Sequence, residues 1–167
     1  ERARLSPADV RAGTRLACQI VVRNDVAVTV PDEVLGITTM QCRVASSRSV
    51  TPLIKEIVLA LPEGAQFDFR AGNFVQVTAP AYRLDFSDIA LEPQHAAEWK
   101  KLGIDKLSSQ SSQSVSRAYS VASRPRDAGL IVLNIRLATP PPAKPQASPG
   151  IVSSWLFGLR EGCLLYT

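Results

Sequence analysis

Residues 117–123 read Arg-Ala-Tyr-Ser-Val-Ala-Ser, and this stretch decides the fold expected for the chain. The stretch favours a β-strand, in which alternate side chains share a face, so Arg117 and Tyr119 are expected to point the same way. A guanidinium pairs with a diphosphate through parallel hydrogen bonds, and a phenol ring lies flat on an isoalloxazine. Taken alone, however, the stretch fits a plain strand with an exposed arginine and a half-buried tyrosine even better.

Two elements downstream change this balance. Residues 130–138 predict a strand whose apolar residues face one way, while Asn134 and Arg136 face the other way, toward solvent or a ligand. After a proline-rich link, Gly150-Ile-Val-Ser-Ser-Trp-Leu156 predicts the start of a helix. The unpaired amides and the positive end of such a helix bind anions. Ser153 and Ser154 also suit plain helix caps, but the order of the three elements favours a diphosphate site.

The sequence before Arg117 predicts the rest of a small antiparallel barrel. Several short apolar stretches between residues 40 and 80 alternate with turn signals, which is typical of such barrels. Residues 90–102 predict a helix, and its Trp99 is expected to pack this insert onto the barrel. The Ser/Gln-rich run 108–116 predicts a loop or a disordered segment.

The first 36 residues are too few to form a core of their own. Ser6-Pro7-Ala8-Asp9 predicts a short capped helix. Residues 16–22 and 26–30 predict two strands joined as a hairpin.

Composition excludes several classes of function. The formal charge of +4 is spread along the chain, which argues against nucleic-acid binding. No apolar run approaches the ~18 residues of a membrane-spanning helix. Three distant cysteines, Cys18, Cys42 and Cys163, show neither zinc spacing nor a disulfide framework, so reduced, cytoplasmic chemistry is expected.

The chain resembles a known family. Arg117-x-Tyr119-Ser120, a strand, and Gly150-x-x-Ser153-x-x-Leu156, in this order, are similar to the flavin-binding barrel of the ferredoxin-NADP reductase superfamily. Two further segments, Asn134-Ile-Arg-Leu-Ala-Thr-Pro-Pro-Pro142 and Arg15-Leu-Ala-Cys-Gln19, most closely resemble the F subunit of the Na+-translocating NADH:quinone oxidoreductases.

This resemblance implies a mostly-β fold. Residues 37–167 would form a six-stranded antiparallel Greek-key barrel that binds FAD and carries one phosphate-binding helix. Residues 1–36 would be the C-terminal remnant of a plant-type [2Fe-2S] ferredoxin domain. Residues 163–167 depart from the family pattern, so the barrel is expected to lack its last strand, and the family's NADH domain is expected to be missing.

The resemblance also implies roles for single residues. Arg117 would contact the FAD diphosphate, Tyr119 would stack on the flavin, and Ser120 would lie near flavin N5 as the catalytic residue. The complete set of implied cofactor-binding residues is Arg117, Ala118, Tyr119, Ser120, Asn134, Arg136, Gly150, Val152 and Ser153. Cys18 would be one [2Fe-2S] ligand, with the other three outside this chain.

The implied function is that of a flavoprotein reductase. FAD would accept a hydride from NADH and pass electrons singly to a [2Fe-2S] cluster, as in a Na+-transporting NADH:quinone oxidoreductase. The expected partners are FAD, a ferredoxin domain, an NADH domain and other subunits of a membrane respiratory complex, and no nucleic acid. The parent protein would lie at the cytoplasmic face of the bacterial inner membrane, and this chain alone is expected to be inactive with NADH.

Two alternatives stay open at this point. The same modules occur in the reductase components of bacterial ring-hydroxylating dioxygenases and monooxygenases. The other alternative is a β-barrel binding module without flavin, in which the arginine and tyrosine are only structural.

Overall fold

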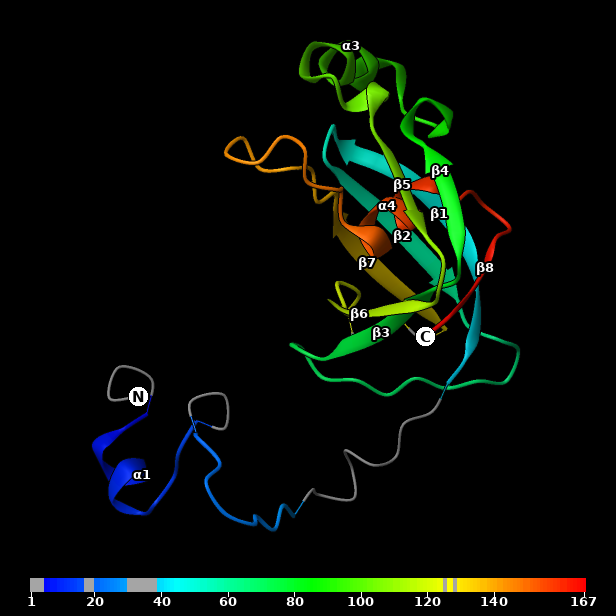
Figure 1. The fold of residues 1–167 in the computed structure, drawn as a ribbon. Helices are drawn as coiled ribbons and strands as arrows, with labels where there is room; N and C mark the ends of the chain where they lie inside the picture. The colour runs from blue at the N-terminus through cyan, green and yellow to red at the C-terminus, as the bar shows by residue number, and fades with distance from the viewer. Residues whose placement is uncertain (1–4, 17–19, 30–38, 125, 128) are drawn as a thin grey trace. The chain divides into compact units, whose positions relative to one another are not determined.

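A six-stranded antiparallel sheet forms the framework of residues 39–167 in the computed structural model (Figure 1). Its strands, listed in spatial order, are β6 (Val115–Ser120), β3 (Phe74–Ala79), β8 (Leu164–Tyr166), β1 (Gln41–Thr51), β2 (Ile54–Ala60) and β7 (Leu130–Arg136). The two edge strands approach each other where the amide of Ala122 donates to the carbonyl of Val132, at 2.8 Å. The sheet therefore curls almost into a barrel, and the predicted mostly-β antiparallel fold is confirmed.

The structure describes residues 5–16, 20–29, 39–124, 126–127 and 129–167. They divide into two compact units, Glu1–Thr38 and Thr39–Thr167. The sheet and every helix discussed below except α1 belong to the second unit.

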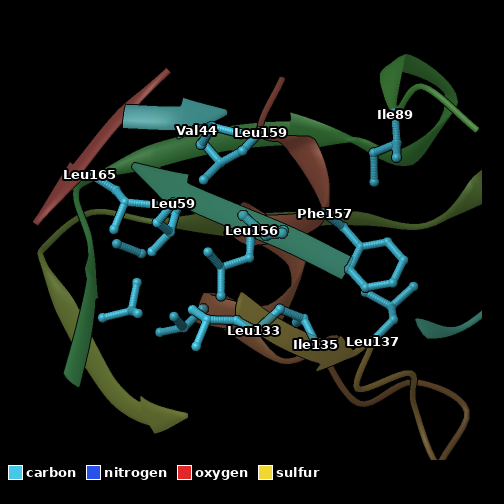
Figure 2. Packing of buried hydrophobic residues seen from close by; sticks show 14 of the residues in the cluster. Val44, Leu59, Ile89, Leu133, Ile135, Leu137, Leu156, Phe157, Leu159 and Leu165 are labelled. Atoms are coloured by element: carbon cyan, nitrogen blue, oxygen red, sulfur yellow. The ribbon is translucent and has the colours of Figure 1, made fainter. Parts of the chain in front are cut away.

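The core lies on the inner side of the sheet. In β7 the side chains at 131, 133 and 135 are fully buried and those at 130, 134 and 136 are exposed, as the alternation predicts. Helix α4 (Ile151–Gly158) adds Leu156 and Phe157 to this core (Figure 2). Each fully buried side chain of this size contributes about 1.5–3 kcal/mol, so the sheet and α4 hold each other in place.

A second, two-stranded sheet projects from the barrel. Its strands are β4 (Tyr82–Asp85) and β5 (Ser108–Ser111), and its tip carries η2 (Phe86–Asp88), α3 (Pro93–Leu102) and η3 (Ile104–Lys106) (Figure 1). Trp99 of α3 is 1% exposed, and its indole N–H donates to the carbonyl of Pro52 at 2.6 Å. The predicted docking of the insert through Trp99 is confirmed.

The prediction of a loop over residues 108–116 holds for 112–114 and is wrong for the rest of this run. Residues 108–111 form β5, and β6 begins at Val115. A run of serines and glutamines has weak strand propensity, but here Tyr82–Asp85 provides a partner strand. Ser109 faces inward and is buried, with its hydroxyl bonded to the phenol of Tyr82.

The expectation that the barrel lacks its last strand is also wrong. Residues 164–166 form β8, which pairs with β1 along residues 41–43 and with β3 at Thr78. Leu165 points inward and is 2% exposed, while Leu164 and Tyr166 face outward. One inward apolar side chain, set between two strands that are distant in sequence, is enough to fill the remaining place in the sheet.

The first unit shows only a short helix among its described residues. Helix α1 (Pro7–Arg11) has the predicted cap, in which Ser6 and Asp9 bond reciprocally. The predicted hairpin is not formed by the described residues 20–29, which contain no strand and are exposed throughout. The β-branched side chains of this segment have no partner surface there, and a strand needs one.

Two kinds of feature are absent from the described residues. No helix there is long and apolar enough to cross a membrane. No cluster of three or more His, Cys, Asp or Glu side chains there is arranged to hold a metal ion. Cys18, the predicted cluster ligand, lies outside the described residues.

One buried cation supports the C-terminal end of α4. Lys55 of β2 is 2% exposed, and its ammonium donates to the carbonyl of Phe157 at 2.6 Å. Burial lowers the pKa of Lys55 to about 8, although Glu92 acts to raise it, and Arg160 lowers it further. Keeping the amine of Lys55 charged at this buried position therefore costs desolvation free energy.

The lowered pKa of Lys55 predicts that this residue's contribution to the free energy of unfolding rises with pH. Because the folded pKa lies below that of the unfolded chain, the unfolded chain binds more protons between about pH 8 and 10. Relative to Lys55→Met, which cannot titrate, the free energy of unfolding of the unsubstituted chain should rise by about 1–2 kcal/mol between pH 7.5 and 9.5. Urea unfolding at both pH values measures it, and a pH-independent difference between the two chains would contradict the assignment.

Candidate functional site

Strand β6 presents Arg117 and Tyr119 on one face, as predicted. They lie directly opposite Val77 and Val75 of β3, and side chains of directly opposed residues share a face. Val75 and Val77 belong to the buried cluster that also contains Val152 and Leu156 of α4. Arg117 and Tyr119 therefore lie on the side of the sheet that α4 covers.

The two side chains differ in environment. Arg117 is exposed, and its guanidinium donates to the carbonyl of the adjacent Ser116 at 2.8 Å. Tyr119 is half-buried, and burial raises its pKa to about 12. Arg117 lowers this pKa and Tyr82 raises it, each by less than burial does. Its phenol therefore stays neutral at physiological pH and places no negative charge beside a bound anion.

Ala118 and Ser120 lie on the opposite face of β6. Ala118 is paired with Gln76, and Ser120 with Phe74, which is 63% exposed. The Ser120 side chain is exposed and makes no hydrogen bond to any described residue. Its hydroxyl is therefore available to a ligand at the end of this strand.

Asn134 and Arg136 lie on the outer face of β7 and are exposed. They share this face with Val132, which is bonded to the segment after β6 through Ala122 and through the hydroxyl of Ser123. Asn134 and Arg136 thus lie on the strand that comes after residues 117–123 in the sequence and that is hydrogen-bonded to the end of this segment. No hydrogen bond or ion pair within the described residues joins them to Arg117 or to α4.

The N-terminal end of α4 is built on Gly150. A Cβ at this position would lie 2.7 Å from Cβ of Ala138 and 2.8 Å from Oγ of Ser153, which is closer than real Cβ contacts. Ser153 donates its hydroxyl hydrogen to the carbonyl of Gly150 at 3.1 Å and accepts from the amide of Ala138 at 3.3 Å. Only glycine leaves room for this junction between the end of β7 and the start of α4.

These contacts define what the helix end offers to a ligand. The side chains of Val152 and Ser153 are buried, so neither is free to bind. The backbone amides of Ile151, Val152 and Ser153 make no hydrogen bond within the described part of the chain. Three orphaned N–H groups at the positive end of a helix suit a phosphate.

Tyr82 fixes this helix end to the projecting hairpin. Its phenol donates to the carbonyl of Ile151 at 2.6 Å and is bonded to the hydroxyl of Ser109 at 2.7 Å. Burial raises the pKa of Tyr82, so the phenol remains a donor at neutral pH. Sequence analysis missed Tyr82, because no local pattern marks it.

Two cavities meet at Ile151. The hairpin cavity, of about 410 Å³, is lined on the hairpin side by Arg83, Ser108, Ser109 and Gln110, and on the other side by Ser148, Pro149 and Ile151. The strand cavity, of about 470 Å³, is lined by residues that include Tyr82, Gln110, Ser111, Gln113, Val115 and Ile151. Both contain Gln110 and Ile151, so the two cavities adjoin at the end of α4.

The arrangement brings Arg117 and Tyr119 to the side of the start of α4, while Ala118, Ser120, Asn134 and Arg136 lie on other faces. Val115 lines the strand cavity, and Arg117 and Tyr119 follow it at alternate positions of β6, on the same face. Helix α4 contacts β6 directly. Arg117 and Tyr119 therefore share the face of β6 whose Val115 borders the strand cavity, and Ile151 at the start of α4 lines both cavities.

Sequence comparisons give close relatives. The chain is 41% identical over 162 residues to the F subunit of the Na(+)-translocating NADH-quinone reductase of Marinomonas sp.. It is 40% identical over 163 residues to the protein of that name from Methylococcus capsulatus, and 38% identical over 162 residues to that from Neisseria gonorrhoeae. Each match covers 97% of this chain and 40% of the relative.

Structural comparison supports the fold. The cytochrome b5 reductase domain of Ulva prolifera nitrate reductase aligns with 77% of this chain at a TM-score of 0.50 and 13% identity, covering 38% of that structure. No protein-family model matches the chain. Over 97% of its length the chain is similar to F subunits of Na(+)-translocating NADH-quinone reductases.

Proposed function

We propose that residues 39–167 bind FAD and form the flavin-binding barrel of an NADH-dependent reductase subunit. One observation carries this proposal. A strand with an exposed guanidinium and a helix with three orphaned amides lie on the same side of the sheet, beside two adjoining cavities. The names of the relatives, and the fold shared with a cytochrome b5 reductase domain, support the same interpretation.

In this proposal the diphosphate is held from two elements. The amides of Ile151–Ser153 donate to one phosphate, and the guanidinium of Arg117 pairs with the diphosphate. The side chain of Ser153 is already used within the fold, so this residue contributes its backbone amide. Gly150 contributes by leaving space rather than by a contact of its own.

The planar ring is assigned to the other end of β6. Tyr119 is half-buried and neutral, which suits stacking on an isoalloxazine. Ser120 is exposed at the end of the strand, and we assign its hydroxyl to flavin N5. Ala118 contributes its backbone beside the ring. Asn134 and Arg136, exposed on the outer face of β7, are proposed as further contacts to FAD.

The chemistry belongs to the cofactor, and the chain supplies binding and orientation. Bound FAD supplies hydride acceptance from NADH and single-electron donation to a [2Fe-2S] centre. Among the described residues, those that line the two cavities include no pair of carboxylates and no combination of nucleophile and base. The tasks that we assign to this barrel are positioning and tuning of the flavin.

The remaining assignments concern the larger protein. The chain spans 40% of the length of its relatives. We propose that Cys18 ligates a [2Fe-2S] cluster, with residues 1–36 completing a ferredoxin domain. Further partners are an NADH domain and the other subunits of a sodium-transporting respiratory complex. The proposed site of action is the cytoplasmic face of the bacterial inner membrane.

Flavin titration tests this function. The purified 167-residue chain, titrated with FAD, should quench flavin fluorescence with a dissociation constant in the micromolar range, about −8 kcal/mol. Mixed with FAD, it should oxidise NADH no faster than free FAD does, because the segment proposed to bind NADH lies outside it. A chain that leaves FAD fluorescence unchanged would favour the binding module without flavin.

A further inference from the structure

Lys55 is a buried cation to which the proposed site assigns no role. It lies on the inner face of β2, directly opposite Ser49 of β1 and Ile135 of β7, and both of these residues are buried. A methionine would fill such a position without the desolvation cost that a charged amine carries. The contacts of the ammonium indicate what the charge does there.

The ammonium of Lys55 contacts Phe157, in the last turn of α4. It donates to the carbonyl of Phe157 at 2.6 Å and lies 5.5 Å from the centre of the phenyl ring. The carbonyls of the last turn have no partner within the helix, and the helix dipole makes this end negative. The phenyl ring stacks on Trp99, whose indole is bonded to the carbonyl of Pro52. A positive charge at Lys55 therefore fixes the C-terminal end of α4 to the sheet.

The other end of the same helix carries the amides of Ile151–Ser153. Helix α4 has eight residues, so its ends are about 12 Å apart, and a rigid element of this length transmits a shift of one end to the other. We infer that Lys55 is a positioning residue for flavin binding, which holds α4 at its C-terminal end so that the amides at the other end meet the phosphates. The inference rests on the proposed function, because it takes the phosphates of FAD to lie at those amides.

The charge on Lys55 should couple flavin binding to pH. A charged donor makes a stronger hydrogen bond than a neutral amine does. Loss of the proton therefore weakens the bond to Phe157, although the fold as a whole gains because the desolvation cost ends. Burial lowers the pKa of Lys55 to about 8, so the proton is lost mainly between pH 7 and 9.5. If the charged form binds FAD better, bound FAD raises the pKa of Lys55, and the affinity for FAD falls as the pH rises.

Two charged groups act on Lys55 from other elements. Burial has the largest effect on the pKa of Lys55; of the two charges, Glu92 raises this pKa and Arg160 lowers it. Glu92 precedes α3 and accepts the amide of Ser49 at 2.8 and 2.9 Å, while Arg160 follows α4 and is exposed. The imidazole of His95 lies 3.3 Å from the carbonyl of Ser49. Substitution of Glu92 or Arg160 can therefore move the titration of Lys55 while the lysine stays in place.

Titration with FAD at several pH values tests the inference. We expect the affinity of the unsubstituted chain to fall about fourfold between pH 7 and 9.5, and that of Lys55→Met to stay constant. At pH 7 Lys55→Met should bind FAD about fourfold more weakly than the unsubstituted chain does. Arg43→Ala, which removes an exposed positive charge from β1, should keep the full pH dependence.

Two charge variants should move the midpoint of this pH profile in opposite directions. Glu92→Gln removes a charge that raises the pKa of Lys55, so the midpoint should move to lower pH. Arg160→Gln removes a charge that lowers this pKa, so the midpoint should move to higher pH. Calorimetry needs no substitution. Binding of FAD at pH 8 should take up about 0.3 of a proton, seen as a binding enthalpy that depends on the ionisation enthalpy of the buffer.

The outcomes separate this inference from the function on which it rests. If the unsubstituted chain binds no FAD at any pH, the proposed function fails. If it binds FAD with the same pH profile as Lys55→Met, if neither charge variant moves the midpoint, or if binding takes up no proton, only the positioning role of Lys55 fails. Urea unfolding checks that each variant is folded. Should Lys55→Met not fold, the charge variants and the proton uptake decide, because they leave Lys55 in place.

Discussion

Substituting Arg117 with alanine should weaken FAD binding about 100-fold and leave the chain folded. Charge-assisted hydrogen bonds are worth about 1.5–3 kcal/mol each, and a 100-fold change corresponds to about 2.7 kcal/mol. The free energy of unfolding should change by less than about 0.5 kcal/mol, because the exposed side chain is bonded only to the carbonyl of its neighbour Ser116. Fluorescence titration and urea unfolding measure the two effects separately.

Two further variants sharpen this test. Arg117→Lys keeps the charge but loses the planar fork, so an intermediate loss of about tenfold is expected. Arg43→Ala removes an exposed arginine from β1 and serves as the control for the loss of one positive charge. If Arg117→Ala binds FAD as tightly as Arg43→Ala does, Arg117 does not hold the diphosphate.

Replacing Gly150 with alanine should impair both folding and flavin binding. The new Cβ would meet Cβ of Ala138 at 2.7 Å, and that atom cannot move without its backbone. Overpacking of this kind costs about 1–3 kcal/mol. The strain should also shift the amides of Ile151–Ser153, so FAD affinity should fall by about 100-fold or more. Urea unfolding and flavin titration measure both changes.

Gly158→Ala is the matched control in the same helix. Its Cβ would lie 2.9 Å from Cδ2 of Leu84, the end of a flexible side chain that can rotate away. Alanine also favours a helix over glycine by up to about 1 kcal/mol. This variant should keep its stability within about 1 kcal/mol and its flavin affinity unchanged. Equal effects at Gly150 and Gly158 would show that the space at Gly150 has no special role.

Sequence reasoning located the elements with strong local signals. The alternation of apolar and polar residues over 130–137 predicted β7, because every second side chain of this strand is buried in the core. The shared face of Arg117 and Tyr119 followed from the geometry of any strand. The helix after Gly150 was predicted from the glycine before it and the serine hydroxyls of its first turn. Trp99 docked the insert because a large apolar ring must be buried.

The elements that were missed depend on partners distant in sequence. Strand β8 has only three residues, and it forms because β1 and β3 leave one place between them. Strand β5 is composed of serine and glutamine, and it pairs because Tyr82–Asp85 lies beside it. The hairpin cavity could not be predicted for the same reason, since Arg83 and Ser148 meet only in the folded chain. The roles of Ser120, Asn134 and Arg136 stay predictions.

The closing strand brings the two ends of the barrel unit together. The amide of Met40 donates to the carbonyl of Thr167 at 2.7 Å, and the amide of Thr167 donates back to the carbonyl of Met40 at 3.0 Å. Polypeptide that enters the barrel and polypeptide that leaves it are therefore tethered at a single point. Segments joined before Met40 and after Thr167 would therefore start from the same place on the barrel. The distance between two modules joined there would depend on the lengths of these segments rather than on the width of the barrel.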